Sequence, residues 1–102
     1  MYKGERVYIM NKYKAISRSY YDIIRVTDNY IEIKSKNTKH MWIISKPMPY
    51  IENKPIIIYH KHSQSVPYYH KHGYAYNIYQ AVNSIKSHDE YVLSGRGKYN
   101  KA

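Results

Sequence analysis

The sequence contains no cysteine and no phenylalanine, and it has only seven acidic residues among 102. The lack of cysteine excludes a disulfide framework, a thiolate metal site and a cysteine nucleophile, and it fits a reducing cytoplasm. The scarcity of acidic residues leaves few candidates for carboxylate catalysis. Asp89 and Glu90 form the only adjacent acidic pair, and neighbouring side chains usually point apart.

Glycine occurs only four times, and the sequence holds neither a glycine-rich phosphate loop nor a nucleophile elbow. The dipeptide His88-Asp89 is similar to that of metal phosphohydrolases, but those enzymes need further His and Asp ligands on long helices. A chain of this length lacks such helices. We therefore favour a protein that is not an enzyme.

Long hydrophobic runs are missing too. No stretch approaches the roughly 18 apolar residues that a membrane span requires, and the first six residues lack the apolar segment of a signal peptide. We therefore expect a soluble, cytoplasmic protein without membrane contact. The aromatic residues are 15 tyrosines and one tryptophan. Because a buried tyrosine hydroxyl needs a hydrogen-bond partner, Ile, Val and Leu must supply the apolar centre of a small core.

Basic residues are abundant, and the net charge is +10 with an isoelectric point near 9.7. This excess favours polyanionic partners, with nucleic acid first and an acidic protein surface second. The abundance of Ile, Tyr, Lys and Asn also resembles the bias of an AT-rich genome. Such a bias would raise the lysine content without any selection for binding.

Short apolar and alternating runs predict an antiparallel sheet. Residues 56–58 are apolar on both faces, which is typical of a central strand. Prolines make residues 46–55 an extended connection. The other expected strands are 5–10, 21–27, 30–34 and 39–45, with a basic loop at 11–19 and polar turns at 28–29 and 35–38.

The strand pattern of residues 4–9, 23–26 and 30–33 is similar to that of an SH3-like small barrel, over about the first 45 residues. The resemblance implies a bent antiparallel sheet or barrel, which we expect to have about five to six strands. As a whole, the chain is similar in style to small uncharacterised proteins of phages and mobile elements of Gram-positive bacteria.

The periodicity then becomes helical. Asn77 is a plausible N-cap, and Ile78, Ala81, Val82 and Ile85 have the spacing of one helix face. We expect a helix over about 78–87, packed across the sheet. Residues 91–93 fit either a further turn or a closing strand.

The predicted fold class is therefore α+β, a small antiparallel sheet with one C-terminal helix. A single domain spans residues 1–93. Its parts are a four-stranded SH3-like part at 1–45, the connection at 46–55, a histidine-rich hairpin at 56–74 and the helical region at 77–93. Residues 94–102 form a basic tail that we expect to be disordered.

The most distinctive motif is Tyr-His-Lys-His, at residues 59–62 and again at 69–72. Alternation along a strand places His60 and His62 on one face, and likewise His70 and His72. A hairpin folded about Val66 would oppose His60 to His72 and His62 to His70. Four imidazoles would then share one patch.

Three interpretations of this patch remain open. A zinc site needs three or four nitrogen or oxygen ligands; His88 could add a ligand and Asp89 a supporting carboxylate, although Lys61 and Lys71 bring positive charge nearby. The histidines could also be ordinary half-exposed strand residues, or line an anion-binding surface. We expect no obligatory cofactor, with zinc as the candidate metal. The metal-ligating candidates are His60, His62, His70, His72 and His88.

The opposite face of the hairpin alternates tyrosine with lysine. Single-stranded nucleic acids are bound by cations along the backbone and by rings stacked on bases, at about 1–3 kcal/mol per base. The first hypothesis is thus a small non-enzymatic module that binds nucleic acid or a nucleoprotein. The candidate residues, including the loop and the tail, are Lys12, Lys14, Arg18, Tyr59, Lys61, Tyr69, Lys71, Arg96 and Lys98.

Two alternatives belong to other classes. One is a phage-type inhibitor or accessory factor that binds a host protein. The other is a metal-dependent nuclease that uses the histidines of the hairpin and His88. An exposed edge strand in so small a sheet could also pair with a second copy of the chain, which would give a homodimer.

Overall fold

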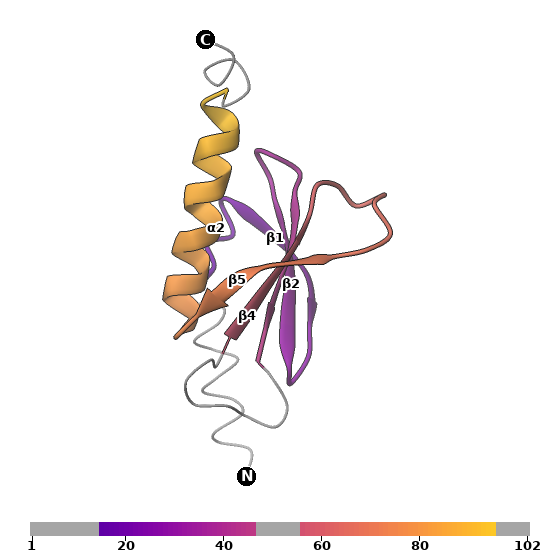
Figure 1. Cartoon of the computed structure of the whole chain (residues 1–102), viewed down its shortest axis with the longest axis vertical. Helices are drawn as coiled ribbons and strands as arrows, with labels where there is room; N and C mark the ends of the chain where they lie inside the picture. Colours follow the sequence, from indigo (N-terminus) through magenta and orange to yellow (C-terminus); the bar gives the residue numbers. More distant parts are fainter. Residues whose placement is uncertain (1–14, 47–55, 96–102) are drawn as a thin grey trace.

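The computed structural model describes residues 15–46 and 56–95, and it confirms the α+β class (Figure 1). Within these ranges, a five-stranded antiparallel sheet carries one C-terminal helix. The elements are β1 (Tyr21–Val26), β2 (Tyr30–Ser35), β3 (Met41–Ser45), β4 (Ile56–Lys61), β5 (His70–Ala75) and α2 (Ile78–Leu93). The expected strand at 5–10, most of the connection at 46–55 and most of the tail lie outside the described residues.

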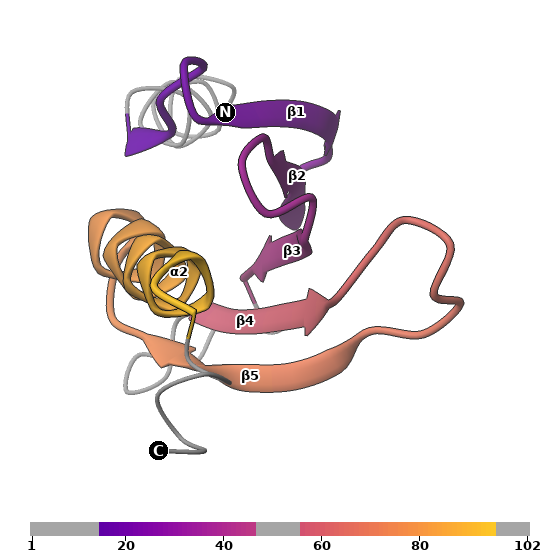
Figure 2. The ribbon, with the colours of Figure 1, turned by 90° about the horizontal axis from the view of Figure 1, so that it is seen from above.

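The strands follow one another across the sheet in chain order, β1-β2-β3-β4-β5. The sheet is open rather than closed into a barrel, and β4 is internal, as its apolar character predicts. Figure 2 shows the sheet from above, curving around α2, which lies on its concave side. The described part of the chain includes no helix that is long and apolar enough to span a membrane.

Directly paired residues share a face of the sheet, so the register separates the two faces. Ile33 pairs with Trp42, and Trp42 pairs with His60, which pairs with His70; this row faces α2. The core on this side consists mainly of isoleucines, including Ile31, Ile33, Ile44, Ile56, Ile58, Ile78 and Ile85, with Trp42. The row Glu32, Ile43, Tyr59 and Lys71 lies on the other face.

The helix begins and packs as its sequence predicts, but it ends later. The side chain of Asn77 accepts a hydrogen bond from the backbone N–H of Gln80, and Ile78, Ala81, Val82 and Ile85 are buried. The helix continues to Leu93 rather than ending near Ser87. The next inward positions after Ile85 are His88 and Asp89, two polar residues that hide the periodicity. Residues 91–93 are therefore helical.

Both edge strands carry an irregularity. In β1 the pairing with β2 shifts between Ile23 and Arg25, and in β5 the pairing with β4 shifts so that His72 has no directly opposed partner. Such bulges interrupt the ladder and make regular pairing with another chain less favourable. A homodimer stays a prediction, and these edges do not favour it.

Candidate functional site

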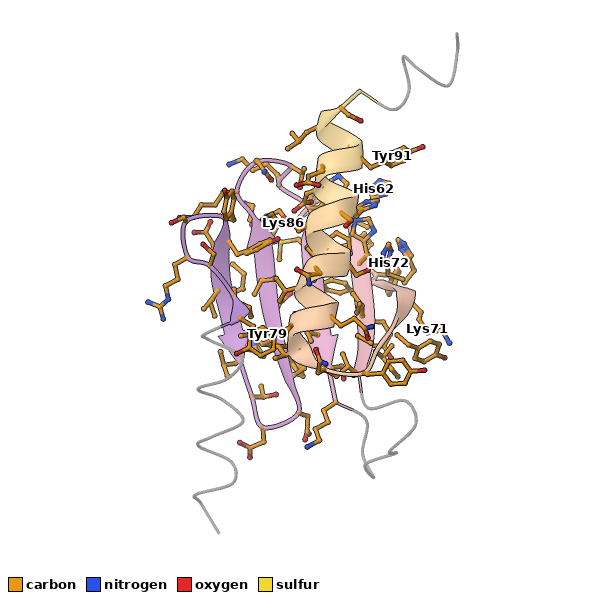
Figure 3. The ribbon with its side chains drawn as sticks, turned by 90° about the vertical axis from the view of Figure 1, so that its left-hand side faces the viewer. His62, Lys71, His72, Tyr79, Lys86 and Tyr91 are labelled. Carbon is orange, nitrogen blue, oxygen red and sulfur yellow. The ribbon has the colours of Figure 1, made fainter. Side chains whose placement is uncertain are left out.

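All six histidines of the chain gather in one cluster, and three of them, His60, His72 and His88, contact the single tryptophan, Trp42. They come from four places: the β2–β3 turn, strand β4 with the residue after it, strand β5, and helix α2. Figure 3 shows His62 and His72 on the same side of the helix. We call this set the histidine cluster; its members are His40, His60, His62, His70, His72 and His88.

His60 is the centre of the cluster and is only 2% exposed. Burial, followed by the nearby His88 and His40, lowers the pKa of His60 to about 3. Partial desolvation by its neighbours also lowers the pKa of His72, although the residue is exposed, with a further contribution from His70. His60 is therefore neutral near pH 7, which is the state in which an imidazole has a lone pair for a metal ion.

The ring of His60 is also surrounded by the other aromatic rings. Its centroid lies 4.1 Å from that of Trp42, 4.8 Å from His88, 4.9 Å from His40, 5.1 Å from His62, 5.2 Å from His70 and 5.7 Å from His72.

Three members form a group that could hold a metal ion. His40, His60 and His88 each offer one ring nitrogen, and these nitrogens lie within 4.8 Å of one another. We call them the buried triad, because His60 and His40 are buried and His88 is half-buried. Their ring centroids are separated by 4.9, 4.8 and 5.6 Å. Imidazoles bound tetrahedrally at 2.0–2.1 Å would have nitrogens about 3.3 Å apart and centroids about 5.2 Å apart. The three ring centroids are thus spaced about as they would be around one ion.

The turn that carries His40 has a defined shape. The backbone N–H of Ser35 donates to the carbonyl of His40 at 2.9 Å, and the N–H of Lys39 donates to the carbonyl of Ser35 at 2.8 Å. Lys39 adopts φ = 67°, in the left-handed region that a non-glycine residue enters only at some cost. This turn folds His40 back over the sheet toward His60.

Asp89 supports the turn from the helix side. Its carboxylate, 4% exposed, accepts hydrogen bonds from Ser35 Oγ at 2.7 Å and Thr38 Oγ1 at 3.0 Å. Ser35 Oγ in turn accepts from Trp42 Nε1 at 3.2 Å, and Thr38 Oγ1 accepts from the N–H of His40 at 3.2 Å. Burial raises the pKa of Asp89, although the two hydroxyls and His40 act in the opposite direction. One carboxylate thereby positions both His40 and Trp42.

The structure brings together every histidine that the sequence nominated as a ligand: His60, His62, His70, His72 and His88. The expected hairpin register is wrong, however, because His60 pairs with His70 rather than with His72. The bulge at His72 and the loop that follows Lys61 shift the pairing by two residues.

His40 is the residue that sequence reasoning missed, since it lies outside the repeated motif. Only the register of the neighbouring strands, which the structure supplies, reveals its place. Met41 pairs with Lys61, so continuing the ladder by one residue places His40 beside His62. The two rings indeed stack, with centroids 5.0 Å apart and an interplanar angle of 19°.

Four of the nominated nucleic-acid residues, Lys12, Lys14, Arg96 and Lys98, lie outside the described residues. Two of the others hold the hairpin loop in place. The ammonium of Lys61 donates to the carbonyl of Val66 at 2.8 Å and lies 4.8 Å from the ring centroid of Tyr69. The Tyr69 hydroxyl donates to the carboxylate of Glu32 at 2.6 Å. These donors are therefore already engaged within the protein.

The remaining candidates are distributed over two surfaces. Tyr59 is half-buried and Lys71 is exposed, both on the sheet face that points away from α2, and Lys71 donates to the hydroxyl of Tyr74 at 2.8 Å. Arg18 is exposed on the segment that precedes β1, and Lys36 donates to its carbonyl at 2.8 Å.

The backbone carbonyl of Arg18 contacts a further group of basic and aromatic side chains, through Lys36. Lys86 of α2 places its ammonium 5.5 Å from the ring centroid of Tyr20, whose side chain is 51% exposed. Lys36, also exposed, lies beside Asp22 at 3.7 Å. We call the set Arg18, Tyr20, Lys36 and Lys86 the basic patch.

Comparison of the chain with known protein families, with curated proteins and with solved structures found no match. Its function therefore has to be inferred from the two sites described above.

Proposed function

We propose that this domain binds a transition-metal ion, zinc in the first place, through His40, His60 and His88. The observation that carries the proposal is the placement of three ring nitrogens within 4.8 Å of one another. An all-imidazole set suits Zn²⁺, Cu²⁺ or Ni²⁺, whereas Mg²⁺ and Ca²⁺ prefer oxygen ligands. Three protein ligands would leave a fourth position for water or for a neighbouring imidazole.

The three ligands come from separate elements, the β2–β3 turn, β4 and α2, so a bound ion would join the helix to the sheet. An ion that binds only the folded chain stabilises it, by about 2.7 kcal/mol when its concentration is a hundred times the dissociation constant. The neutral state of His60 favours binding, because no proton has to leave that ring first. Asp89 contributes by holding the turn that carries His40.

The direct test is a thermal unfolding experiment on the full chain purified without a histidine tag. Addition of Zn²⁺ should raise the melting temperature, and a chelator should reverse the rise. His40→Ala should abolish the effect, while the matched control His70→Ala, an exposed member of the cluster, should retain it. A melting temperature that is indifferent to zinc and chelator, with no binding seen by calorimetry at micromolar protein, would reject the proposal.

Binding of nucleic acid is the second candidate function. It is supported by the net charge of +10 and by the basic patch, in which a cation lies over an exposed tyrosine ring. Such a surface suits electrostatic capture of a phosphate backbone together with stacking of a base on Tyr20.

A labelled mixed-sequence oligonucleotide would test this candidate by fluorescence anisotropy. Affinity should fall steeply as salt is raised, and Lys86→Ala and Tyr20→Ala should weaken binding. Tyr68→Ala is a suitable control, since Tyr68 is 82% exposed in the hairpin loop. Salt-independent binding, or none at micromolar protein, would reject a nucleic-acid surface.

Experiments with the same protein and oligonucleotide also distinguish the remaining alternative functions. A host protein target, bound through an acidic surface, predicts a pull-down whose yield survives nuclease treatment. The metal-dependent nuclease predicts cleavage of the labelled oligonucleotide only when zinc is added and only with the buried triad intact. Uncleaved oligonucleotide in the presence of a zinc-loaded protein would exclude that activity for the sequence tested.

A further inference from the structure

We infer that the sheet face turned away from α2 binds single-stranded nucleic acid through Tyr59, Lys71 and Tyr74. We call these three residues the sheet platform. The inference deepens the second candidate function, because it adds a binding surface apart from the basic patch and names the strandedness of the ligand. Figure 2 shows that this face is the convex one, and Figure 3 shows Lys71 and Lys86 on opposite sides of α2. The platform and the basic patch are therefore separate surfaces.

The pairing of β4 with β5 brings the platform together. Tyr59 is directly opposed to Lys71, and Ile57 is directly opposed to Tyr74. Diagonal neighbours on two paired strands lie about 7–8 Å apart, so the rings of Tyr59 and Tyr74 can each take a different base of one strand. Half-buried Ile57, and Ile43 opposite Tyr59 on β3, continue this face with apolar surface.

The bulge in β5 puts Lys71 and Tyr74 on the same face. In a regular strand, residues three apart point to opposite faces. Here Ile58 pairs with Gly73. The next residue of β4, Tyr59, pairs with Lys71, so one residue of β5 is left over. The ammonium of Lys71 consequently lies 5.0 Å from the ring centroid of Tyr74 and donates to its hydroxyl at 2.8 Å.

Charge and exposure favour a single strand as the occupant. The ring of Tyr74 is 48% exposed, and its hydrogen bond with Lys71 raises the pKa of that lysine, which is therefore charged at neutral pH. A cation beside an exposed ring can contact a phosphate while the ring stacks on a base, and bases paired in a duplex are not available for such stacking. Glu32, the acidic residue of this row on β2, is opposed by Arg25 and accepts a hydrogen bond from Tyr69.

Fluorescence anisotropy of the full chain, with a labelled mixed-sequence single strand and with the duplex of the same sequence, tests the platform. The single strand should bind at least about fivefold more tightly than the duplex. Tyr59→Leu and Tyr74→Leu remove a ring but keep an apolar side chain, and each should weaken single-strand binding about five- to tenfold at unchanged salt dependence. Lys71→Gln should reduce the slope of log affinity against log salt by about 0.7.

Tyr91→Leu is the matched control. Tyr91 lies on α2 and is 49% exposed, close to the 48% of Tyr74, so its replacement should leave the affinity unaltered. Circular dichroism establishes that each variant is folded. Tyr74→Leu is the decisive variant, because replacing a side chain with this exposure leaves the core intact.

Equal affinities for single strand and duplex would overturn the platform. Full binding by Tyr74→Leu and Lys71→Gln, together with a loss in Lys86→Ala, would also overturn it and would leave the basic patch as the nucleic-acid surface. Self-association of the original protein that Tyr74→Leu abolishes, with single-strand binding unchanged, would assign this face to a second copy of the chain instead. No binding of either oligonucleotide at micromolar protein would overturn both nucleic-acid proposals and leave the zinc proposal standing.

Discussion

Nδ1 of His40 lies 2.9 Å from Nε2 of His60, so a turn residue and a central strand residue share one hydrogen bond inside the histidine cluster. One ring must donate and the other must accept, which holds a single proton between them. For a metal ion to be bound by both nitrogens, the donor ring would have to move this proton to its other nitrogen, with both rings staying neutral. In the metal-free protein this hydrogen bond joins the turn to β4, and a bound ion would replace it by two metal–nitrogen bonds.

The pH dependence of folding provides a first prediction. In the folded chain the pKa of His60 is lowered from 6.5 to about 3. At pH values between these two, His60 is therefore protonated in the unfolded chain but not in the folded chain. The stability of the metal-free protein should therefore be greatest above pH 6.5 and should decline as the pH falls toward 3. Urea unfolding followed by Trp42 fluorescence measures this, and His60→Gln should flatten the slope.

The part of this range just below pH 6.5, farthest from the ordinary pKa of a carboxyl group, is the most informative for this test. The pKa of Asp89 is raised from 3.8 by burial, so its protonation favours the folded chain at lower pH and opposes the histidine effect there. A slope that is unaltered by His60→Gln would show that another group is responsible.

The carboxylate of Asp89 provides a second prediction. The Ser35 and Thr38 hydroxyls already accept from Trp42 and from the N–H of His40, so each must donate to Asp89. Asp89→Asn replaces one acceptor by a donor and should lower the free energy of unfolding by about 1–3 kcal/mol.

Glu90→Gln is the matched control for Asp89, because the neighbouring Glu90 is exposed. It should leave the free energy of unfolding within about 0.5 kcal/mol of the original. Equal stabilities of the Asp89 and Glu90 variants in urea would show that the buried hydrogen bonds contribute nothing.

A third prediction concerns Tyr69, which the sequence nominated for nucleic-acid contact and which the fold uses to hold the hairpin loop. Its hydroxyl donates to the carboxylate of Glu32, and burial and this contact raise the pKa of the Tyr69 phenol. Tyr69→Phe should destabilise the domain by about 1.5–3 kcal/mol, the value of a hydrogen bond to a charged group. Tyr68→Phe should be neutral, since Tyr68 is exposed, and a chemical denaturation series distinguishes the two.

The start of the helix provides a fourth prediction. Asn77→Ala removes the side-chain oxygen that caps the N–H of Gln80 and should cost about 1 kcal/mol of stability. Asn83→Ala, on the exposed side of the same helix, should be neutral or slightly stabilising because alanine has the higher helix propensity. If both changes had the same effect on the denaturation midpoint, the cap would have no energetic role.

Periodicity in the sequence was sufficient for the elements themselves. Alternation around Ile31 and Ile33 predicted β2, the triple isoleucine at 56–58 predicted an internal strand, and the stripe from Ile78 to Ile85 predicted the helix and its buried face. The end of the helix was not predictable in this way. Asp89 occupies an inward position. The cost of burying its carboxylate is offset by hydrogen bonds from hydroxyl groups of β2 and the following turn.

The sequence by itself determined the fold class, the N-cap at Asn77 and the gathering of His60, His62, His70 and His72 on one hairpin. These follow from local preferences, because the period of a helix or a strand decides which side chains share a face. Tertiary structure alone decided the hairpin register and the inclusion of His40 in the histidine cluster. It also decided how the cluster divides into a buried triad and three exposed histidines. Those depend on a bulge at His72, on the turn at Lys39 and on the packing of α2 against the sheet. The physical reason is that distances between elements depend on packing and on loop geometry. The periodicity of the sequence within one element contains no information about either.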